Sequence, residues 1–132
     1  MVPAFEAFQL LHEMDRCMKL LLAIVQPNKL QAVREALQNA GIPRLTVLDA
    51  QGYGRQKGHS SIYAGVEYQI HLLRKVNLEI FVNDDFVERA IDTICRVAKT
   101  GSQGSIGDGK IFVLPAVEAI TIDSGSRGPS SV

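Results

Sequence analysis

The first long apolar run, residues 18–26 (MKLLLAIVQ), sets the strongest limit on the fold. It is almost continuously hydrophobic but short, which is typical of a strand buried on both faces in the middle of a sheet. Pro27 ends the run. The period then changes to that of a helix, with its apolar face at Leu30, Val33, Leu37 and Ala40. We expect Asn28 to cap the first turn of this helix and Gly41 to close its last turn.

The following segments continue to alternate between strand and helix patterns. Residues 45–53 and 76–82 alternate apolar and polar side chains as strands do. Asn83 and the pair Asp84-Asp85 offer a cap and an acidic first turn to a second helix. The apolar face of that helix comprises Val87, Ala90, Ile91, Ile94, Val97 and Ala98. Two further short strands are expected at 110–115 and 117–122.

The order of these elements is strand, helix, strand, long loop, strand, helix, strand. This is the order of the α+β ferredoxin-like fold, βαββαβ, in which two helices cover one face of an antiparallel sheet. The first strand is apolar on both faces, and the sequence offers no third helix to cover the second face. Burial of that face against sister subunits is the simplest solution, so we expect a homo-oligomer.

Length and composition bound the class of protein. The 132 residues suit one domain, and 14 basic residues balance 14 acidic ones, so charge gives no case for nucleic acid or an anionic membrane as a partner. Cys17 and Cys95 lie far apart without ligand-like spacing, which argues against a disulfide framework or a zinc site. No apolar run reaches the roughly 18 to 20 residues that cross a bilayer. We expect a cytoplasmic protein without membrane insertion.

The two ends of the chain differ from the main domain, which we assign to residues 18–123. Residues 1–17 place Phe5, Phe8, Leu11 and Met14 at roughly helical spacing. This N-terminal extension is either a docking arm or a segment upstream of the true start. Residues 124–132 are rich in Gly, Ser and Pro and are expected to form a flexible tail.

The stretch from Gly52 to Lys75 is too long to be a simple connection, because about two to five residues suffice to join two strands. It is either a binding loop, centred on residues 54–72, or a solvated surface insertion. Gln56 lies among Arg55 and Lys57, and an amide oxygen in such surroundings can bind a hard cation such as Mg²⁺. Lys75, at the other end, can face an anionic ligand.

The segment 104–112 (GSIGDGKIF) is the second chemical feature. Its glycines allow backbone N–H groups to converge on phosphate oxygens, and Lys110 adds a positive charge. The spacing is not that of a P-loop, and the motif alone favours a tight turn between helix and strand over a phosphate site. Nothing in the chain has the form of a nucleophile with its base and orienting group, so an enzyme is the weaker hypothesis.

Taken together, these motifs resemble the PII signal transduction family. The resemblance rests on KLQAVREAL in the first helix, GYGRQKGH at the start of the loop, Tyr63 and Tyr68 within it, KVNLEI after it, and IGDGKIFVLP near the end. It extends from Met18 to the end of the chain, and GRQKGH followed by IGDGKIF is a specific combination. The resemblance implies a ferredoxin-like homotrimer that binds ATP or ADP between subunits and senses 2-oxoglutarate.

The resemblance also implies roles for individual residues. The nucleotide site would comprise Thr46, Gly54, Arg55, Gln56, Gly107, Asp108, Gly109 and Lys110. The 2-oxoglutarate site would comprise Gln56, Lys57, Gly58 and Lys75, with Gln56 as the Mg²⁺ ligand. The long loop would dock on a target protein such as a regulatory enzyme, a transporter or an ammonium channel. Tyr68 falls where many bacterial members are modified by a uridylyltransferase.

The chain departs from the family pattern near the phosphates. Three extra residues follow Gly101, and Ser105 takes the place of a common lysine. Thr121 and Asp123 stand where typical members have two arginines, and the lost guanidinium contacts predict nucleotide binding weaker by about 1 to 3 kcal/mol or more. Arg127 would compensate if it folded back. Two alternatives therefore accompany the sensor hypothesis: a paralogue with weakened ligand binding that acts mainly as a protein-interaction module, and a slow ATPase.

Overall fold

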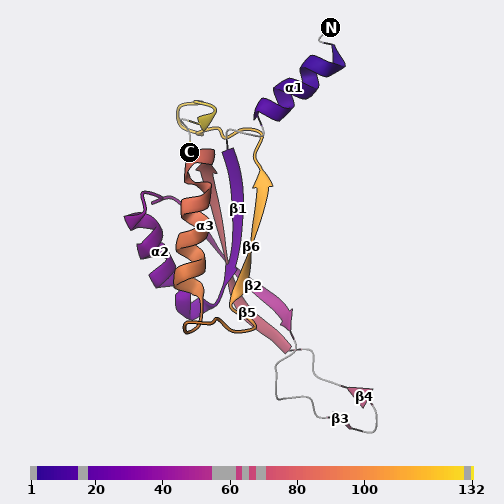
Figure 1. Cartoon of the computed structure of the whole chain (residues 1–132), viewed down its shortest axis with the longest axis vertical. Coiled ribbons are helices and arrows are strands. Elements are labelled where there is room, and N and C mark those ends of the chain that lie inside the picture. Colours follow the sequence, from indigo (N-terminus) through magenta and orange to yellow (C-terminus); the bar gives the residue numbers. More distant parts are fainter. Residues whose placement is uncertain (1–2, 15–17, 55–61, 64–65, 68–70, 130–131) are drawn as a thin grey trace.

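The computed structural model describes residues 3–14, 18–54, 62–63, 66–67, 71–129 and 132. An N-terminal helix, α1 (Ala4–Met14), precedes a sheet of four strands and two further helices (Figure 1). The elements after α1 are β1 (Met18–Val25), a 3₁₀ turn (Pro27–Lys29), α2 (Leu30–Asn39), β2 (Thr46–Gly54), β5 (His71–Asn83), α3 (Asp84–Ala98) and β6 (Gly109–Pro115). A small hairpin, β3 (Ile62–Tyr63) with β4 (Val66–Glu67), lies between β2 and β5 in the chain.

The sheet has the strand order β2-β5-β1-β6, and all neighbouring strands are antiparallel. The two central strands, β1 and β5, pair along the full length of β1, from Met18 opposite Asn83 to Val25 opposite Val76. Helices α2 and α3 lie on one side of the sheet (Figure 1). This confirms the predicted ferredoxin-like βαββαβ fold, with the long connection between β2 and β5.

The core lies between the sheet and the two helices. Every second residue of the central strands points into it, and these side chains are fully buried together with those on the inner faces of α2 and α3: Leu21, Val25, Leu78, Ile80, Val33, Leu37 and Ile94. Removing such side chains from water supplies roughly 1.5 to 3 kcal/mol each and drives formation of the two layers.

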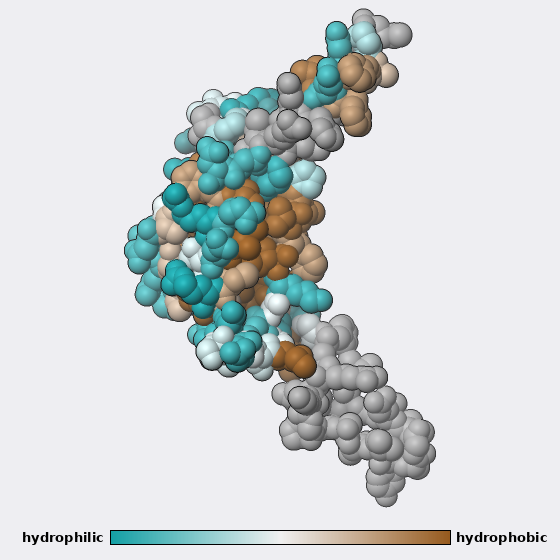
Figure 2. All heavy atoms as spheres, in the orientation of Figure 1, coloured by the Kyte–Doolittle hydropathy of each residue, from teal (hydrophilic) through white to brown (hydrophobic). Residues whose placement is uncertain are grey.

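The opposite face of the sheet is also apolar, but neither α2 nor α3 covers it. Leu22 of β1 is half-buried there and pairs with Phe112, which is 48% exposed. Leu48 on β2 is 41% exposed. Hydrophobic atoms gather where β1 and β6 run, away from α2 (Figure 2). We call this surface the open sheet face. The continuous run 18–26 is thus explained by two apolar faces, of which the chain covers one.

Of the residues predicted to cap or end α2 and α3, Gly41 and Asn83 lie where expected and Asn28 does not. Gly41 has a φ of 85° and donates its N–H to the carbonyl of Gln38, which confirms the predicted end of α2. Asn83 is the N-cap of α3, but its side chain makes no capping hydrogen bond. The prediction that Asn28 caps α2 is wrong. Asn28 lies inside the 3₁₀ turn, and Lys29 takes the N-cap position because the chain begins to coil directly after Gln26.

The strand predicted at 117–122 is also absent. The chain turns after β6, and only one isolated bridge forms, between Ile120 and Arg127. Gly125, with a φ of 69°, donates its N–H to the carbonyl of Thr121 and so reverses the chain. The segment folds on itself because an alternating pattern forms a strand only where a neighbouring strand can pair with it. No helix within the described ranges is long and apolar enough to cross a membrane.

Candidate functional site

The connection between α3 and β6, residues 100–109, is a structured loop that we call the glycine loop. Asp108 organises it by accepting three hydrogen bonds: from the hydroxyl of Thr100 at 2.5 Å, from the N–H of Thr100 at 3.0 Å and from the N–H of Ser105 at 2.7 Å. These donors favour the charged carboxylate, with the Thr100 hydroxyl first, and lower the pKa of Asp108 to about 2. The carboxylate of Asp108 therefore stabilises the folded loop through these three hydrogen bonds.

All four glycines of the loop have a positive φ, which other residues rarely adopt, and the values are largest at the last two. Gly107 has a φ of 100° and Gly109 a φ of 124°. A Cβ atom on Gly109 would lie 1.8 Å from the carbonyl oxygen of Ile24 in β1. The tight approach of the loop to β1 therefore requires glycine at this position. An open, side-chain-free backbone next to a lysine fits an anionic group such as phosphate.

Lys75 of β5 reaches this loop across the sheet. Its ammonium nitrogen lies 2.6 Å from the carbonyl oxygen of Gly107, 32 positions away in sequence. Lys110, at the start of β6, pairs with Ile24 and shares the open sheet face with Lys75. The structure thus brings together Lys75, the glycine loop and Lys110, which were predicted from separate motifs.

A second donor to the same carbonyl was missed from the sequence. The side-chain amide of Gln26 donates to the carbonyl of Gly107 at 2.7 Å. Gln26 directly follows β1, whose last residue pairs with Gly109. The contact depends on this long-range register, which no local pattern in the sequence reveals.

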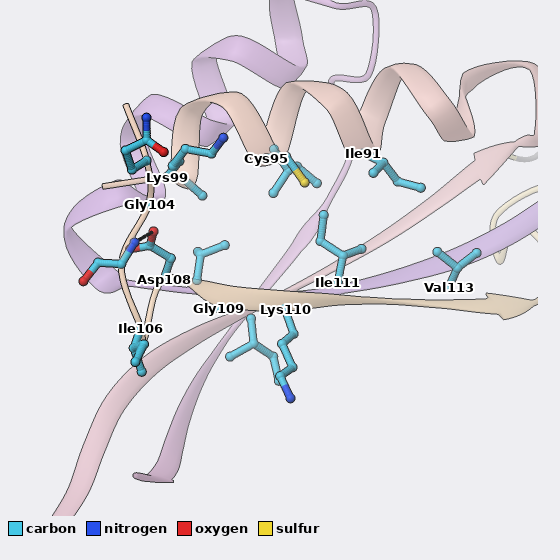
Figure 3. A pocket seen from close by; sticks show the side chains of 16 residues that line it. Ile91, Cys95, Lys99, Gly104, Ile106, Asp108, Gly109, Lys110, Ile111 and Val113 are labelled. Atoms are coloured by element: carbon cyan, nitrogen blue, oxygen red, sulfur yellow. Dashed lines mark hydrogen bonds between the residues drawn. The ribbon is translucent and has the colours of Figure 1, made fainter. Parts of the chain in front are cut away.

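On the helix side of β6 lies an apolar groove of about 740 Å³. Ile91 and Cys95 of α3 face Ile111 and Val113 of β6 across it, whereas Lys110 points to the opposite side of the strand (Figure 3). The loop residues Gly104 and Asp108 close one end of the groove. The start of β6 therefore differs on its two sides: it borders an apolar groove toward α3 and carries the Lys110 ammonium on the open sheet face, which is otherwise apolar along β6 at Phe112.

The other predicted site residues lie elsewhere. Thr46 opens β2, which is the edge strand opposite β6, so two strands separate it from the glycine loop. Gly54 ends β2 opposite His71. The predicted residues of the loop base and tip lie outside the described residues: Arg55, Gln56, Lys57, Gly58 and Tyr68. In the described part of the chain, no group of three or more His, Cys, Asp or Glu side chains is placed to hold a metal ion.

The segment after β6, residues 116–129, contains Thr121 and Asp123, whereas the other departures expected from the family pattern, Ser105 and the extra residues after Gly101, lie in the glycine loop. Its hydrogen bonds include Thr121 N–H to the carbonyl of Ser126 and Gly128 N–H to the carbonyl of Ala119. Arg127 donates to both carboxylate oxygens of Glu118 at 3.2 Å. The guanidinium of Arg127, which could replace the two arginines of typical family members only if it folded back toward the phosphates, is therefore paired with Glu118 of its own segment.

Comparisons with known proteins place the chain in a family. The family model described as nitrogen regulatory protein P-II matches residues 18–126. The chain belongs to the P-II family. Over 115 residues it is 51% identical to the nitrogen regulatory protein P-II of Bradyrhizobium diazoefficiens and 47% identical to P-II 1 of Escherichia coli K12, covering 87% of this chain and 100% of each relative.

A solved P-II structure shows the same fold. The crystal structure of Arabidopsis thaliana PII bound to citrate superposes with a TM-score of 0.71 at 37% identity, covering 88% of this chain and 92% of that one. The P-II match begins at Met18, so α1 lies outside the matched region. In α1, Phe5 and Phe8 are 69% and 61% exposed.

Proposed function

We propose that this P-II protein senses adenine nucleotide and 2-oxoglutarate and regulates targets of nitrogen and carbon metabolism through its 54–72 loop. The observation that carries this proposal is the convergence of Lys75 and the glycine loop, with the ammonium 2.6 Å from the carbonyl of Gly107. An ammonium next to an open glycine backbone, with Lys110 on the same sheet face, is a surface suited to carboxylates and phosphates.

The complete site needs a neighbouring subunit. Thr46 and the glycine loop lie on opposite edges of one sheet, so a single chain cannot close both around one nucleotide. The open sheet face presents exposed apolar side chains that association would bury. A homotrimer brings the β2 edge of one subunit to the β6 edge of the next and forms the nucleotide cleft between them.

Each residue then has a distinct role. The backbone of Gly107 and Gly109, with Lys110, holds nucleotide phosphates, and Asp108 shapes the loop. Gln56 binds Mg²⁺ and, with Arg55, Lys57 and Gly58, forms the base of the long loop. Lys75 receives the far carboxylate of 2-oxoglutarate. The citrate in the Arabidopsis PII structure supports a fold that accepts small carboxylates.

The protein acts in the cytoplasm as a binding module and not as a catalyst. Ligand state sets the conformation of the 54–72 loop, which docks on a regulatory enzyme, a transporter or an ammonium channel. Tyr68 in this loop is the candidate site for a uridylyltransferase.

Titration calorimetry on the full chain tests this proposal. ATP, ADP and AMP are titrated with and without Mg²⁺ and 2-oxoglutarate. Lys110→Ala removes a charge-assisted contact to phosphate and should weaken ATP binding by about tenfold to a hundredfold. Gln56→Ala removes the proposed Mg²⁺ ligand and should abolish 2-oxoglutarate binding, whereas intact binding would show that the Mg²⁺ bridge is wrong. Absence of any nucleotide binding at millimolar concentration would sink the sensor proposal.

One observation favours the alternative of an interaction module with weakened ligand binding. The 116–129 segment holds Thr121 and Asp123 and pairs its arginine with Glu118, so it offers little to phosphates. Pull-down of target proteins that is insensitive to ATP and 2-oxoglutarate would support this alternative over the sensor. Turnover of ATP above that of Lys110→Ala would instead support a slow ATPase.

A further inference from the structure

Two side chains from different strands converge on one backbone carbonyl. Lys75 Nζ lies 2.6 Å and Gln26 Nε2 2.7 Å from the carbonyl oxygen of Gly107. A carbonyl oxygen has two lone pairs, so it can accept both hydrogen bonds at once. A Cβ atom on Gly107 would lie 3.5 Å from the Gln26 amide nitrogen and 3.9 Å from the Lys75 nitrogen. Both groups therefore lie directly over this glycine.

The two donors differ in charge. The Lys75 ammonium binds a carboxylate more strongly than it binds a neutral carbonyl, because both partners are then charged. A carboxylate ligand on the open sheet face therefore competes with Gly107 for Lys75. The neutral Gln26 amide gains no comparable advantage and keeps its contact with the carbonyl.

We propose that Gln26 is a positioning residue that holds the glycine loop through the carbonyl of Gly107 while Lys75 turns to a carboxylate ligand. The ligand part rests on the proposed function, whereas the contact between Gln26 and the loop does not. Without Gln26, Lys75 would be the only one of the two donors left on the carbonyl of Gly107. A carboxylate ligand that binds Lys75 would then free this part of the glycine loop, which forms part of the ligand's own site.

Amide hydrogen exchange on the ligand-free protein tests the positioning role. Gln26→Met keeps the length of the side chain but removes the donor. It should speed exchange of the amides at 105–109 by about threefold to tenfold, the effect of one modest hydrogen bond. Gln38→Met is the matched control, because Gln38 is exposed on the last turn of α2. Lys75→Met should act in the same direction, and the double variant should exceed the sum of the two.

Two results of the exchange experiment would contradict the positioning role of Gln26. Exchange at 105–109 in Gln26→Met equal to that in the parent protein and in Gln38→Met would show that Gln26 does not hold the loop. Equal rates in the double variant and in Lys75→Met would show that Lys75 alone does so.

Calorimetry with 2-oxoglutarate in the presence of MgATP tests the ligand part. Gln26→Met should weaken 2-oxoglutarate binding by about threefold to tenfold, although Gln26 is assigned no contact with the ligand. Unchanged 2-oxoglutarate affinity in Gln26→Met would show that Gln26 is not needed to hold the glycine loop while Lys75 binds the ligand. If the parent protein does not bind 2-oxoglutarate, the ligand assignment fails, and hydrogen exchange alone decides whether Gln26 positions the loop.

Discussion

The glycine loop and the 116–129 segment are both irregular, glycine-containing stretches, but they are held in different ways. The glycine loop is tied to the rest of the fold by Gln26, by Lys75 and by the close approach of Gly109 to β1. The 116–129 segment is joined to β1 at its start, where Ala116 donates to the carbonyl of Met18. Its other described hydrogen bonds are largely internal, including the pair between Arg127 and Glu118. The fold therefore places the first stretch, whereas local turns shape the second.

Under the proposed function, this difference bears on which stretch binds the anionic ligand. Around the glycine loop the cations Lys75 and Lys110 share the open sheet face with a backbone free of side chains. In the 116–129 segment the guanidinium of Arg127 faces a carboxylate, and Asp123 adds a further negative charge. Phosphate recognition should depend almost wholly on the first stretch.

The largest effect is expected from alanine substitution at glycine in the two stretches. Gly109→Ala places a Cβ 1.8 Å from the carbonyl oxygen of Ile24 at a φ of 124°. Overpacking and backbone strain should together lower the free energy of unfolding by about 3 kcal/mol or more. Gly125→Ala has a φ of 69° but open space around its Cβ, so it should cost only about 1 kcal/mol.

Urea denaturation of both alanine variants measures this difference. Equal losses would mean that positive φ alone determines the cost and that the glycine loop is no more constrained than the turn.

Much of this architecture could be predicted from local patterns. The run 18–26 became β1, and the helical period after it became α2, because strong apolar periodicity determines which face must be buried. The alternation at 117–122 was equally strand-like, but a strand also needs a partner, and the chain turns back at Gly125 instead. Asn28 failed as a cap because the chain already coils at Pro27, so that Asn28 lies inside the 3₁₀ turn.

The site was predictable where a motif is continuous and not where it depends on register. The glycines and Lys110 are adjacent in sequence, and Lys75 was predicted from its place at the base of the long loop and again by the family resemblance. Gln26 carries no local signal, since its contact with Gly107 spans 81 positions and exists only because β1 pairs with β6. The internal role of Asp108 depends likewise on the folded shape of the loop.

The second prediction concerns the addition of positive charge to the 116–129 segment. Thr121→Arg combined with Asp123→Arg replaces a carboxylate and a hydroxyl by two guanidinium groups. If the segment borders the phosphates, ATP should bind about tenfold to a hundredfold more tightly, as expected for one or two charge-assisted hydrogen bonds.

Calorimetry with ATP and AMP checks this gain, and Ser124→Arg serves as the control for added charge. The gain should be larger for ATP than for AMP because it acts on the outer phosphates. An equal gain from Ser124→Arg would reduce the effect to general electrostatic attraction.

A smaller effect is expected from neutralising Asp108, because Gln26, Lys75 and Gly109 also hold the glycine loop. The pKa of Asp108 is lowered from 3.8 to about 2, so the charged carboxylate stabilises the folded loop. This contribution is complete above pH 3.8 and is lost as the pH falls through about 2. The amide resonances of Thr100 and Ser105, followed by NMR during acid titration, should shift with an apparent pKa near 2.

Asp108→Asn should remove this titration and perturb the same amides at neutral pH, whereas Asp123→Asn should leave them unchanged. A midpoint at 3.8 for Thr100 and Ser105 would mean that the three hydrogen bonds do not persist in solution.

The smallest effect is expected from the pair in the 116–129 segment. Arg127 is largely exposed, and exposed ion pairs contribute less than about 1 kcal/mol, so Arg127→Ala should barely change the free energy of unfolding. It should also leave ATP affinity unaltered, because the guanidinium is already engaged by Glu118. A double-mutant cycle with Glu118→Ala, followed by urea denaturation and ATP calorimetry, measures both quantities. A tenfold loss of ATP affinity in Arg127→Ala, with none in Glu118→Ala, would show that Arg127 leaves its partner for the phosphates. The two stretches would then share the ligand, and the contrast between them would hold only for the ligand-free protein.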